Sequence, residues 1–240
     1  MSSPSLAGVG ALLVSGAKQA GLKTSPARIK AALKNTARPV EGVEPWAQGP
    51  GLAQVGPAFE HLRAHQGIGA FDVHFKVETN DNTLAKGDGL YWREGRSPGR
   101  QEARFTVAPQ FLESVPLEAR QAFEDSLILE SSAPWVEVPR FLNVANGSRP
   151  FSIWVTVPAS GPAGSAHFAE VRAVSARQPG AGPVFRIPIT VISPLVGQPA
   201  VRPVEAFKVS LNAGGIVRAF HQAPADASHL RLRVRRDRDD

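Results

Sequence analysis

The sequence contains no cysteine, and it has only one methionine and one tyrosine among 240 residues. Without cysteine the chain can form no disulfide, no cysteine-based zinc site and no thiol nucleophile. Long hydrophobic runs are also missing, because the apolar stretch over residues 6–14 is too short to cross a bilayer. No basic leader precedes that stretch, so it does not have the form of a secretory signal. These absences predict a cytoplasmic protein without a membrane partner.

The composition is otherwise that of a folded chain. Hydrophobic residues make up 42% of the sequence, which is enough to build a core and argues against disorder of the whole chain. Glycine and proline are frequent, with 22 and 21 residues, but they stay below the roughly 25–30% typical of low-complexity chains. The length favours one or two domains.

The charge is basic, with a net value of +6 and a pI near 10.2. The arginines that cause it are mostly scattered singly, and the one cluster, over residues 231–238, is partly offset by Asp237, Asp239 and Asp240. Apolar residues and arginines alternate over residues 230–235, which is typical of a half-buried strand with a solvated face. We therefore expect no nucleic-acid partner, although a basic nucleic-acid binder remains an alternative that binding to oligonucleotides at low salt would test.

Residues 1–66 have helical spacing of apolar residues. Pro4 stands in the first turn of a helix that is rich in small residues and ends near Gly21, and we expect this helix to be buried on most sides. Ser25-Pro26 predicts the capped start of a second helix. A turn over residues 44–51, a short strand over 52–55 and a final helix from Pro57 complete this part. Such helices lack a sheet to cover, so they resemble the end of an α/β domain more than an independent one.

From residue 71 the apolar residues recur with a period of two, which predicts strands. Residues 79–100 are polar and rich in glycine and are expected to form a loop or a hairpin with a long excursion. Pro188 predicts an edge strand or a bulge. Short strands separated by turn residues indicate an antiparallel sandwich of immunoglobulin type over residues 70–195. The predicted strands are Phe71–Val77, Ala103–Ala108, Asp125–Leu129, Phe151–Val157, Phe168–Ser175 and Val184–Ile192.

The last part of the chain predicts a second β unit that does not close. Residues 194–203 have the composition of a linker, and strands are expected at Phe207–Leu211, Ile216–Phe220 and Leu230–Val234. Three strands are too few for a stable closed sheet. With helices that lack a sheet at one end and an incomplete sheet at the other, we expect the chain to be a fragment.

The opening residues Met1-Ser2-Ser3-Pro4 resemble a motif of subtilisin-type serine peptidases. That motif is Gly-Thr-Ser-Met-(Ser or Ala)-x-Pro, with the nucleophilic serine at the start of a buried helix of small residues. The resemblance extends to a second helix ending in residues 33–37 and to the segment Gln48-Gly49-Pro50-Gly51-Leu52, in the same order as in that family. A chance match to separate packing helices would not place these elements in sequence.

Residues 183–192 and 132–136 narrow the resemblance to the tripeptidyl-peptidase II family, in which a β-sandwich follows the peptidase domain. The resemblance implies a multidomain fold class. Residues 1–66 would be the C-terminal helical remnant of the α/β subtilisin-like catalytic domain, 70–195 an all-β immunoglobulin-like sandwich, and 204–240 the truncated start of a further, jelly-roll-like β domain. The family's activity is release of tripeptides from free N-termini in cytosolic protein turnover, by large assemblies of many subunits.

The resemblance assigns no catalytic residue within this chain. The nucleophile would directly precede Met1, and the family's Asp, His and oxyanion Asn would lie further upstream. Met1, Ser2, Ser3 and Pro4 would be the scaffold that follows the nucleophile. We therefore expect the 240-residue chain alone to be inactive and to bind no cofactor, while peptide substrates and self-assembly belong to the longer parent.

Other candidate sites have simpler interpretations. His61 and His65 stand at i and i+4 on a helix, a spacing that can hold a metal, but no third ligand is evident and we expect no metal site. Asp81, Asp88 and Glu94 lie in a glycine-rich loop but lack the order of an EF-hand.

Two further features indicate structure more than chemistry. Asn146-Gly147-Ser148 fits a glycosylation sequon but is read as a turn. The four tryptophans are expected in the core or at a domain interface. No Gly-x-Ser-x-Gly elbow places a serine for nucleophilic catalysis. The tryptophans are Trp46, Trp92, Trp135 and Trp154.

The alternative function is a non-enzymatic β-sandwich module for interaction or assembly.

Overall fold

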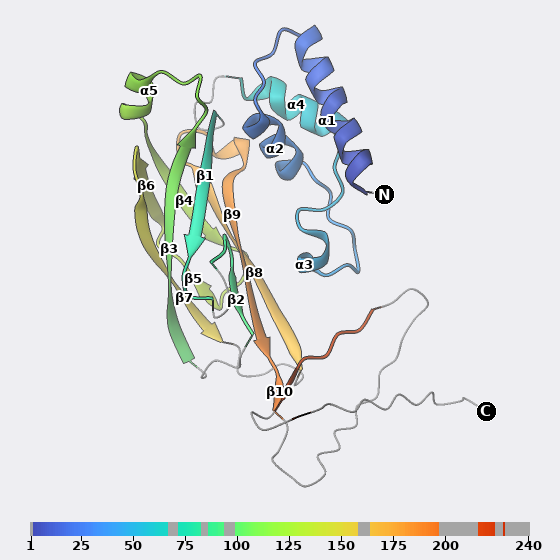
Figure 1. Ribbon diagram of the computed structural model, residues 1–240, viewed down its shortest axis with the longest axis vertical. Coiled ribbons are helices and arrows are strands. Elements are labelled where there is room, and N and C mark those ends of the chain that lie inside the picture. Colours follow the sequence, from blue (N-terminus) through green and yellow to red (C-terminus); the bar gives the residue numbers. More distant parts are fainter. Residues whose placement is uncertain are drawn as a thin grey trace, which may run out of the picture.

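Helices come first and strands follow, as the change of period near residue 71 predicts (Figure 1). The computed structural model describes residues 2–66, 72–82, 86–93, 99–157, 164–196, 216–223 and 228. The helices form a compact group beside one end of a two-sheet sandwich (Figure 1). We call residues 2–66 the helical unit and residues 72–193 the sandwich.

The helical unit has a small core of its own. Ser25 caps α2, since its Oγ accepts a hydrogen bond from the Arg28 backbone N–H at 3.1 Å, and Pro26 occupies the first helical position as predicted. The buried residues Leu13, Ala32, Ala58 and Leu62 bring α1, α2 and α4 together. The helices are α1 (Ser2–Gln19), α2 (Pro26–Asn35), α3 (Pro45–Gln48) and α4 (Val55–Ala64).

The helical unit differs from the sequence expectation in three places. The α1 helix is buried along one side only, at Leu13 and Ala17, because the other described elements cover no more of it. The turn over residues 44–51 contains the short helix α3. The strand expected at 52–55 is reduced to a single bridge between Arg38 and Leu52, because α4 already begins at Val55.

Gly51 is needed at that bridge. Its φ of +113° lies in the region that disfavours side chains, and an added Cβ would come 2.4 Å from the Arg38 carbonyl oxygen. The Gln48 side chain holds the same loop. Its Oε1 accepts a hydrogen bond from the Val40 N–H, and its Nε2 donates to the carbonyl oxygens of Val40 and Val43. The backbone conformation and the lack of space therefore explain why the segment after α3 has a glycine at position 51.

The strands form two sheets packed face to face. Among the described residues, one sheet has the order β1-β3-β7-β5 and the other β2-β9-β8-β4-β6. All pairs within them are antiparallel except β2 with β9. The strands are β1 (Val73–Thr79), β2 (Leu90–Trp92), β3 (Gly99–Phe111), β4 (Glu124–Ser131), β5 (Val136–Glu137), β6 (Phe141–Ala145), β7 (Arg149–Val157), β8 (Ser165–Ser175) and β9 (Pro183–Ser193).

The core lies between the sheets and comes from the inward residue of each alternating pair. In β1 the buried Val73, Phe75 and Val77 alternate with side chains on the outer face, as the sequence predicts. Phe75 contacts Phe185 of the opposite sheet with ring centroids 5.7 Å apart. The largest fully buried side chains include Trp92, Phe105, Ile153 and Ile187.

One expectation for the sandwich was confirmed and one was wrong. Residues 79–100 form the expected hairpin with a long excursion, because the flanking strands β1 and β3 pair antiparallel, and the excursion contains the unexpected β2, whose Leu90 and Trp92 are buried. Pro188 marks neither a sheet edge nor a bulge, because β9 lies between β2 and β8 and the register shift of the β8–β9 pair falls at Ala173/Val174, opposite the start of β9. Pairing with β2 begins at Ile189, so the proline stands just before the point where β9 needs a donor on that side. The sequence analysis also missed β5, β6 and α5 (Leu117–Gln121).

The C-terminal part is described only in short stretches. Leu195–Val196 (β10) pairs in parallel with His221–Gln222 (β11). The strand expected at 216–220 was wrong, because residues 216–220 are not in a strand and the short β11 begins after them, at His221. The strands expected at 207–211 and 230–234, and the arginine cluster of residues 231–238, lie outside the described residues.

Candidate functional site

The motif that the sequence analysis singled out lies at the start of α1. Ser2 begins the helix, and Ser3 and Pro4 are exposed in its first turn, while Met1 lies outside the described residues. The first turn contains no acidic side chain. A helix start without a neighbouring carboxylate keeps the positive end of its dipole available to an anionic group.

His61 and His65 lie together at the end of α4, as their spacing predicts, with ring centroids 4.4 Å apart. Their polar contacts go to the backbone: the His61 Nε2 and the Ala181 carbonyl oxygen are 2.8 Å apart, and the His65 Nδ1 lies 2.8 Å from the His61 carbonyl oxygen. Partial burial lowers the pKa of His61, although the contact with Ala181 opposes that shift and His65 adds to it. The neutral imidazole thus has a structural partner on the sandwich.

The other candidate ligands do not come together as a metal site among the described residues. Asp81 accepts a hydrogen bond from the Arg104 N–H, and Asp88 is exposed, while Glu94 lies outside the described residues. Within the described part of the chain, no three histidine or acidic side chains gather as metal ligands would. Asn146 and Ser148 are exposed around Gly147, whose φ is +149°, in a turn between β6 and β7.

The tryptophans differ in their surroundings. Trp92 is fully buried and Trp135 packs against the core, as expected. Trp154 lies on the outer face of β7 with the Arg100 guanidinium 4.7 Å from its ring. Trp46 of α3 is 39% exposed and meets Phe168 of β8 edge-on at 6.3 Å, so it joins the helical unit to the sandwich.

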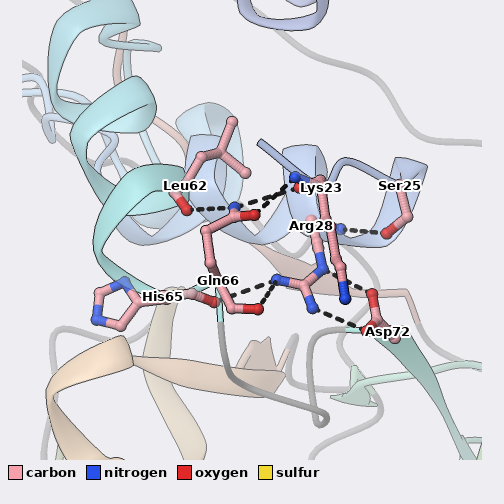
Figure 2. A network of polar contacts seen from close by, with 7 residues as sticks. All are labelled: Lys23, Ser25, Arg28, Leu62, His65, Gln66 and Asp72. Carbon is pink, nitrogen blue, oxygen red and sulfur yellow. Dashed lines mark hydrogen bonds and ion pairs between the residues drawn. The ribbon is translucent and has the colours of Figure 1, made fainter. Parts of the chain in front are cut away.

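The junction of the two parts is held by a clamp around Arg28 (Figure 2). The side chain of this α2 residue is 5% exposed. Its Nε and Nη2 donate to the two carboxylate oxygens of Asp72, at 2.6 and 2.8 Å, directly before β1. Its Nη1 donates to the carbonyl oxygens of His65 and Gln66 at the end of α4. One guanidinium therefore ties two helices to the first strand of the sandwich, in the fork geometry for which arginine is suited.

Gln66 extends the clamp to the loop before α2 (Figure 2). Its Oε1 accepts from the Lys23 N–H at 2.6 Å, and its Nε2 donates to the carbonyl oxygens of Lys23 and Leu62. These bonds satisfy a carbonyl at the end of α4 that has no partner within the helix. The end of α4 and the start of α2 are thus fixed to each other before either meets the strand.

A second contact joins the helices to the sandwich through residues 181–183, which we call the strap. Asn35, at the end of α2, donates from Nδ2 to the carbonyl oxygens of Ala181 and Pro183 at 3.1 and 3.2 Å. The Ala181 oxygen is also the partner of His61. Gly182 lies against Asn35 with a φ of +80°, and an added Cβ would come 2.9 Å from the Asn35 amide nitrogen. The strap therefore depends on a glycine for both backbone conformation and space.

The sequence analysis missed this junction. Arg28 and Asp72 lie 44 positions apart, and Asn35 and Ala181 lie 146 apart, so no local spacing connects them. The capped helix start at Ser25 and the residues 33–37 of the second helix were recognised, but as helix signals only. The polar side chains of the junction are engaged with one another or with backbone carbonyls, so we assign the junction a positional role: it sets how α2 and α4 sit on the sandwich.

The sequence of the chain is similar to those of known proteins. Residues 73–192, half of the chain, match the family described as Tripeptidyl-peptidase II, first Ig-like domain. The chain is 36% identical to Tripeptidyl-peptidase 2 of Caenorhabditis elegans over 81% of its length. It is 34% identical to the protein of that name from Arabidopsis thaliana over 98% of its length. The chain spans only 14% and 17% of these relatives.

A solved structure gives the same result for the fold. The crystal structure of Tripeptidyl Peptidase 2 (TPP II) matches with a TM-score of 0.74 and 32% identity, over 82% of this chain and 16% of that chain. Because 82% exceeds the half occupied by residues 73–192, the likeness extends beyond the sandwich. The chain belongs to the tripeptidyl-peptidase II family, and its sandwich is that family's first Ig-like domain.

Proposed function

We propose that this chain is the part of a tripeptidyl-peptidase II-like serine exopeptidase in which the catalytic domain ends and the first Ig-like domain begins. In this proposal residues 1–66 are the end of the subtilisin-like domain, 70–195 the sandwich, and 204–240 the start of a further jelly-roll-like β domain. The parent releases tripeptides from free N-termini in the cytosol and self-assembles. The observation that carries the proposal is the family match of the sandwich with the helical unit clamped onto it.

The chain's contribution to catalysis is then a scaffold and not a reagent. In the subtilase motif that Met1-Ser2-Ser3-Pro4 resembles, the nucleophile stands directly before the methionine. The α1 helix, 18 residues long and without an acidic residue in its first turn, would direct its positive end toward that serine and toward negative charge that develops beside it. None of the family's Asp, His, Asn and Ser is matched within the chain, so the chain alone is inactive.

The uncovered surface of α1 supports this assignment. Leu6 and Leu12 are 50% and 62% exposed on a helix that is apolar on most sides. A helix of that composition is ordinarily buried all round. The remainder of a catalytic domain would cover these residues, while the described elements cover only the side that bears Leu13 and Ala17.

Activity measurements on two proteins test the proposal. The purified 240-residue chain is expected to release no product from a fluorogenic tripeptide amide with a free N-terminus. The full-length protein of the same gene is expected to hydrolyse it and to be labelled by a serine reagent at the residue directly before Met1. A reagent-sensitive rate from the short chain, or labelling elsewhere, would overturn the assignment.

The alternative is a non-enzymatic assembly module. The exposed side chains of Leu6, Leu12 and Trp46 favour it, because large apolar residues on a surface often mark a protein interface. If the chain is such a module, the helical unit should be stable without any preceding sequence. Limited proteolysis separates the two, since the proposal expects early cleavage within residues 2–66 and survival of residues 72–193.

A further inference from the structure

A cleft of about 370 Å³ lies where α2 passes beside β1, the edge strand of one sheet, and the start of β9 in the other sheet. One wall is α2, and the others are β1, the segment 86–88 before β2, and the start of β9. Lysines gather here: four of the chain's seven line this one cleft, together with an arginine. The basic lining residues are Lys30, Lys34, Lys76, Lys86 and Arg186, and the acidic ones are Glu78 and Asp88.

Most of this positive charge is not neutralised locally. Lys76 pairs with Glu78 at 2.9 Å, but Lys30, Lys34 and Lys86 form no ion pair with any carboxylate in the described part of the chain. Arg186, at the inner end, shares the single carboxylate of Glu170 with Arg172. The Arg186 Nε is buried and has no hydrogen-bond partner among the described residues.

The arrangement is unfavourable for the protein alone. Lys30 and Lys34 stand at i and i+4 on α2, a spacing at which like charges destabilise a helix. The pKa of Lys34 is lowered, first by partial desolvation in the cleft and then by the charge of Lys30. The pKa of the nearby His74 is lowered as well, by desolvation and by both lysines. These groups share a positive potential that the nearby carboxylates Asp88 and Glu170, which oppose the shift at Lys34, offset only in part.

We propose that this cleft binds a small, multiply charged oxyanion of the phosphate class. Lysine ammonium groups from α2 and from residue 86 would meet the anion from opposite walls, with Arg186 behind it. The phosphate class fits better than a single carboxylate because two or more negative charges match the surplus of positive ones, and lysine binds phosphate as a compact point charge. The volume lies in the range of small-molecule sites.

The site would also connect the anion to the junction. Lys30 and Lys34 lie on the same helix as Arg28 and Asn35, and Arg186 donates to the Asn35 Oδ1 at 3.2 Å. Neutralising the repulsion along α2 would therefore favour the helix in its docked position. The structure assigns the cleft a role in fastening the helical unit to the sandwich when the anion is present.

Isothermal titration with sodium pyrophosphate at low ionic strength tests the proposal on the full 240-residue chain. The double variant Lys30→Gln/Lys34→Gln is expected to bind about tenfold more weakly or worse, since each removes a charge-assisted contact. The matched control Lys18→Gln/Lys23→Gln removes the same charge from outside the cleft and is expected to bind as the parent does. Melting curves verify that both variants fold.

A second readout follows the imidazole of His74 by NMR, assigned with His74→Gln. Bound pyrophosphate would counter the charges of Lys30 and Lys34 and raise the pKa of His74. Loss of binding in both double variants alike would indicate unspecific screening and overturn the site. Absence of pyrophosphate binding by the parent chain overturns it too, and binding of a glutamate-rich peptide in its place would assign the cleft to a protein partner.

Discussion

The sandwich and the helical unit of this chain differ strongly in how many apolar side chains they bury. The sandwich holds a continuous core between two sheets, with Phe105, Ile153 and Ile187 almost or fully buried. The helical unit has only Leu13, Ala32, Ala58 and Leu62 in its core, and two of these are alanines. Since burial of apolar area is the main source of folding stability, the sandwich can be stable by itself, whereas the helices rely on what they are docked against.

The junction between the two parts relies on polar contacts. The clamp and the strap join the two parts through arginine, asparagine and histidine side chains that bond to Asp72 and to backbone carbonyls. Such bonds depend on geometry, while apolar packing tolerates sliding. The comparison indicates that the sandwich provides the stability and the junction provides the orientation of α1.

The largest effect is expected from the sandwich core. Replacing Ile187, which is fully buried in β9, with alanine is expected to lower the free energy of unfolding by about 2–5 kcal/mol, because it leaves a cavity between the sheets. Leu117→Ala, in the exposed α5, is the control and should cost little. Urea denaturation followed by tryptophan fluorescence measures both. An equal, small change in the two variants would mean that the sandwich is not the stable part.

The clamp comes second. Arg28→Ala leaves Asp72 and the carbonyls of His65 and Gln66, directly after α4, without their donor and is expected to cost about 1–3 kcal/mol, reduced by the solvent that already reaches Asp72. Hydrogen exchange should speed up in α2 and α4 while β3 and β7 stay protected. Arg28→Lys should rescue little, because an ammonium cannot form the fork. Arg63→Ala, at an exposed pair in α4, is the matched control. Faster exchange throughout the sandwich would contradict the separation of the two parts.

The strap is expected to have an effect of similar size to that of the clamp. Gly182→Ala places a side chain at a φ of +80° and a ψ of −176°, a combination almost restricted to glycine, and should cost about 1–3 kcal/mol. It also pushes on the Asn35 amide. Gly180→Ala, with open space at its Cβ, serves as the control. If calorimetry gives the same melting temperature for both, the strap does not constrain the junction.

The difference between the two parts also explains what the sequence could predict. The alternation in β1 and the Ser25-Pro26 helix start are local signals, and both were confirmed. The resemblance to the tripeptidyl-peptidase II family, drawn from short motifs, was confirmed as well. Strand β2 was missed because three residues in a glycine-rich stretch carry no periodicity, and its parallel pairing with β9 is a long-range contact.

The junction and the basic cleft could not be predicted for a related reason. Arg28 looks like any arginine on a helix until Asp72 is brought beside it by the docking of α2. Lys30 and Lys34 read as a solvated helix face until β1 and the segment before β2 close the cleft around them. The sequence analysis overestimated the burial of α1. Its apolar composition indicates that the helix packs against other residues, but it does not indicate whether those residues belong to the described part of the chain.

The smallest expected effect is a pH dependence of the junction through His61. Burial lowers the pKa of the folded His61 below its usual value, so the unfolded chain takes up a proton more readily than the folded one as the pH falls. The stabilisation that His61 contributes is therefore complete above its unfolded pKa of about 6.5 and declines as the pH falls toward the folded pKa.

His61→Gln tests this prediction, because glutamine can still donate to the Ala181 carbonyl but does not titrate. Urea denaturation at pH 7.5 and pH 5 should show that the parent loses more stability than the variant. His74 also has a lowered pKa, so His74→Gln must be measured in parallel to separate the two contributions. If His61→Gln and the parent respond to pH alike, the neutral imidazole is not what fastens α4 to the strap, and Asn35 alone holds the Ala181 carbonyl.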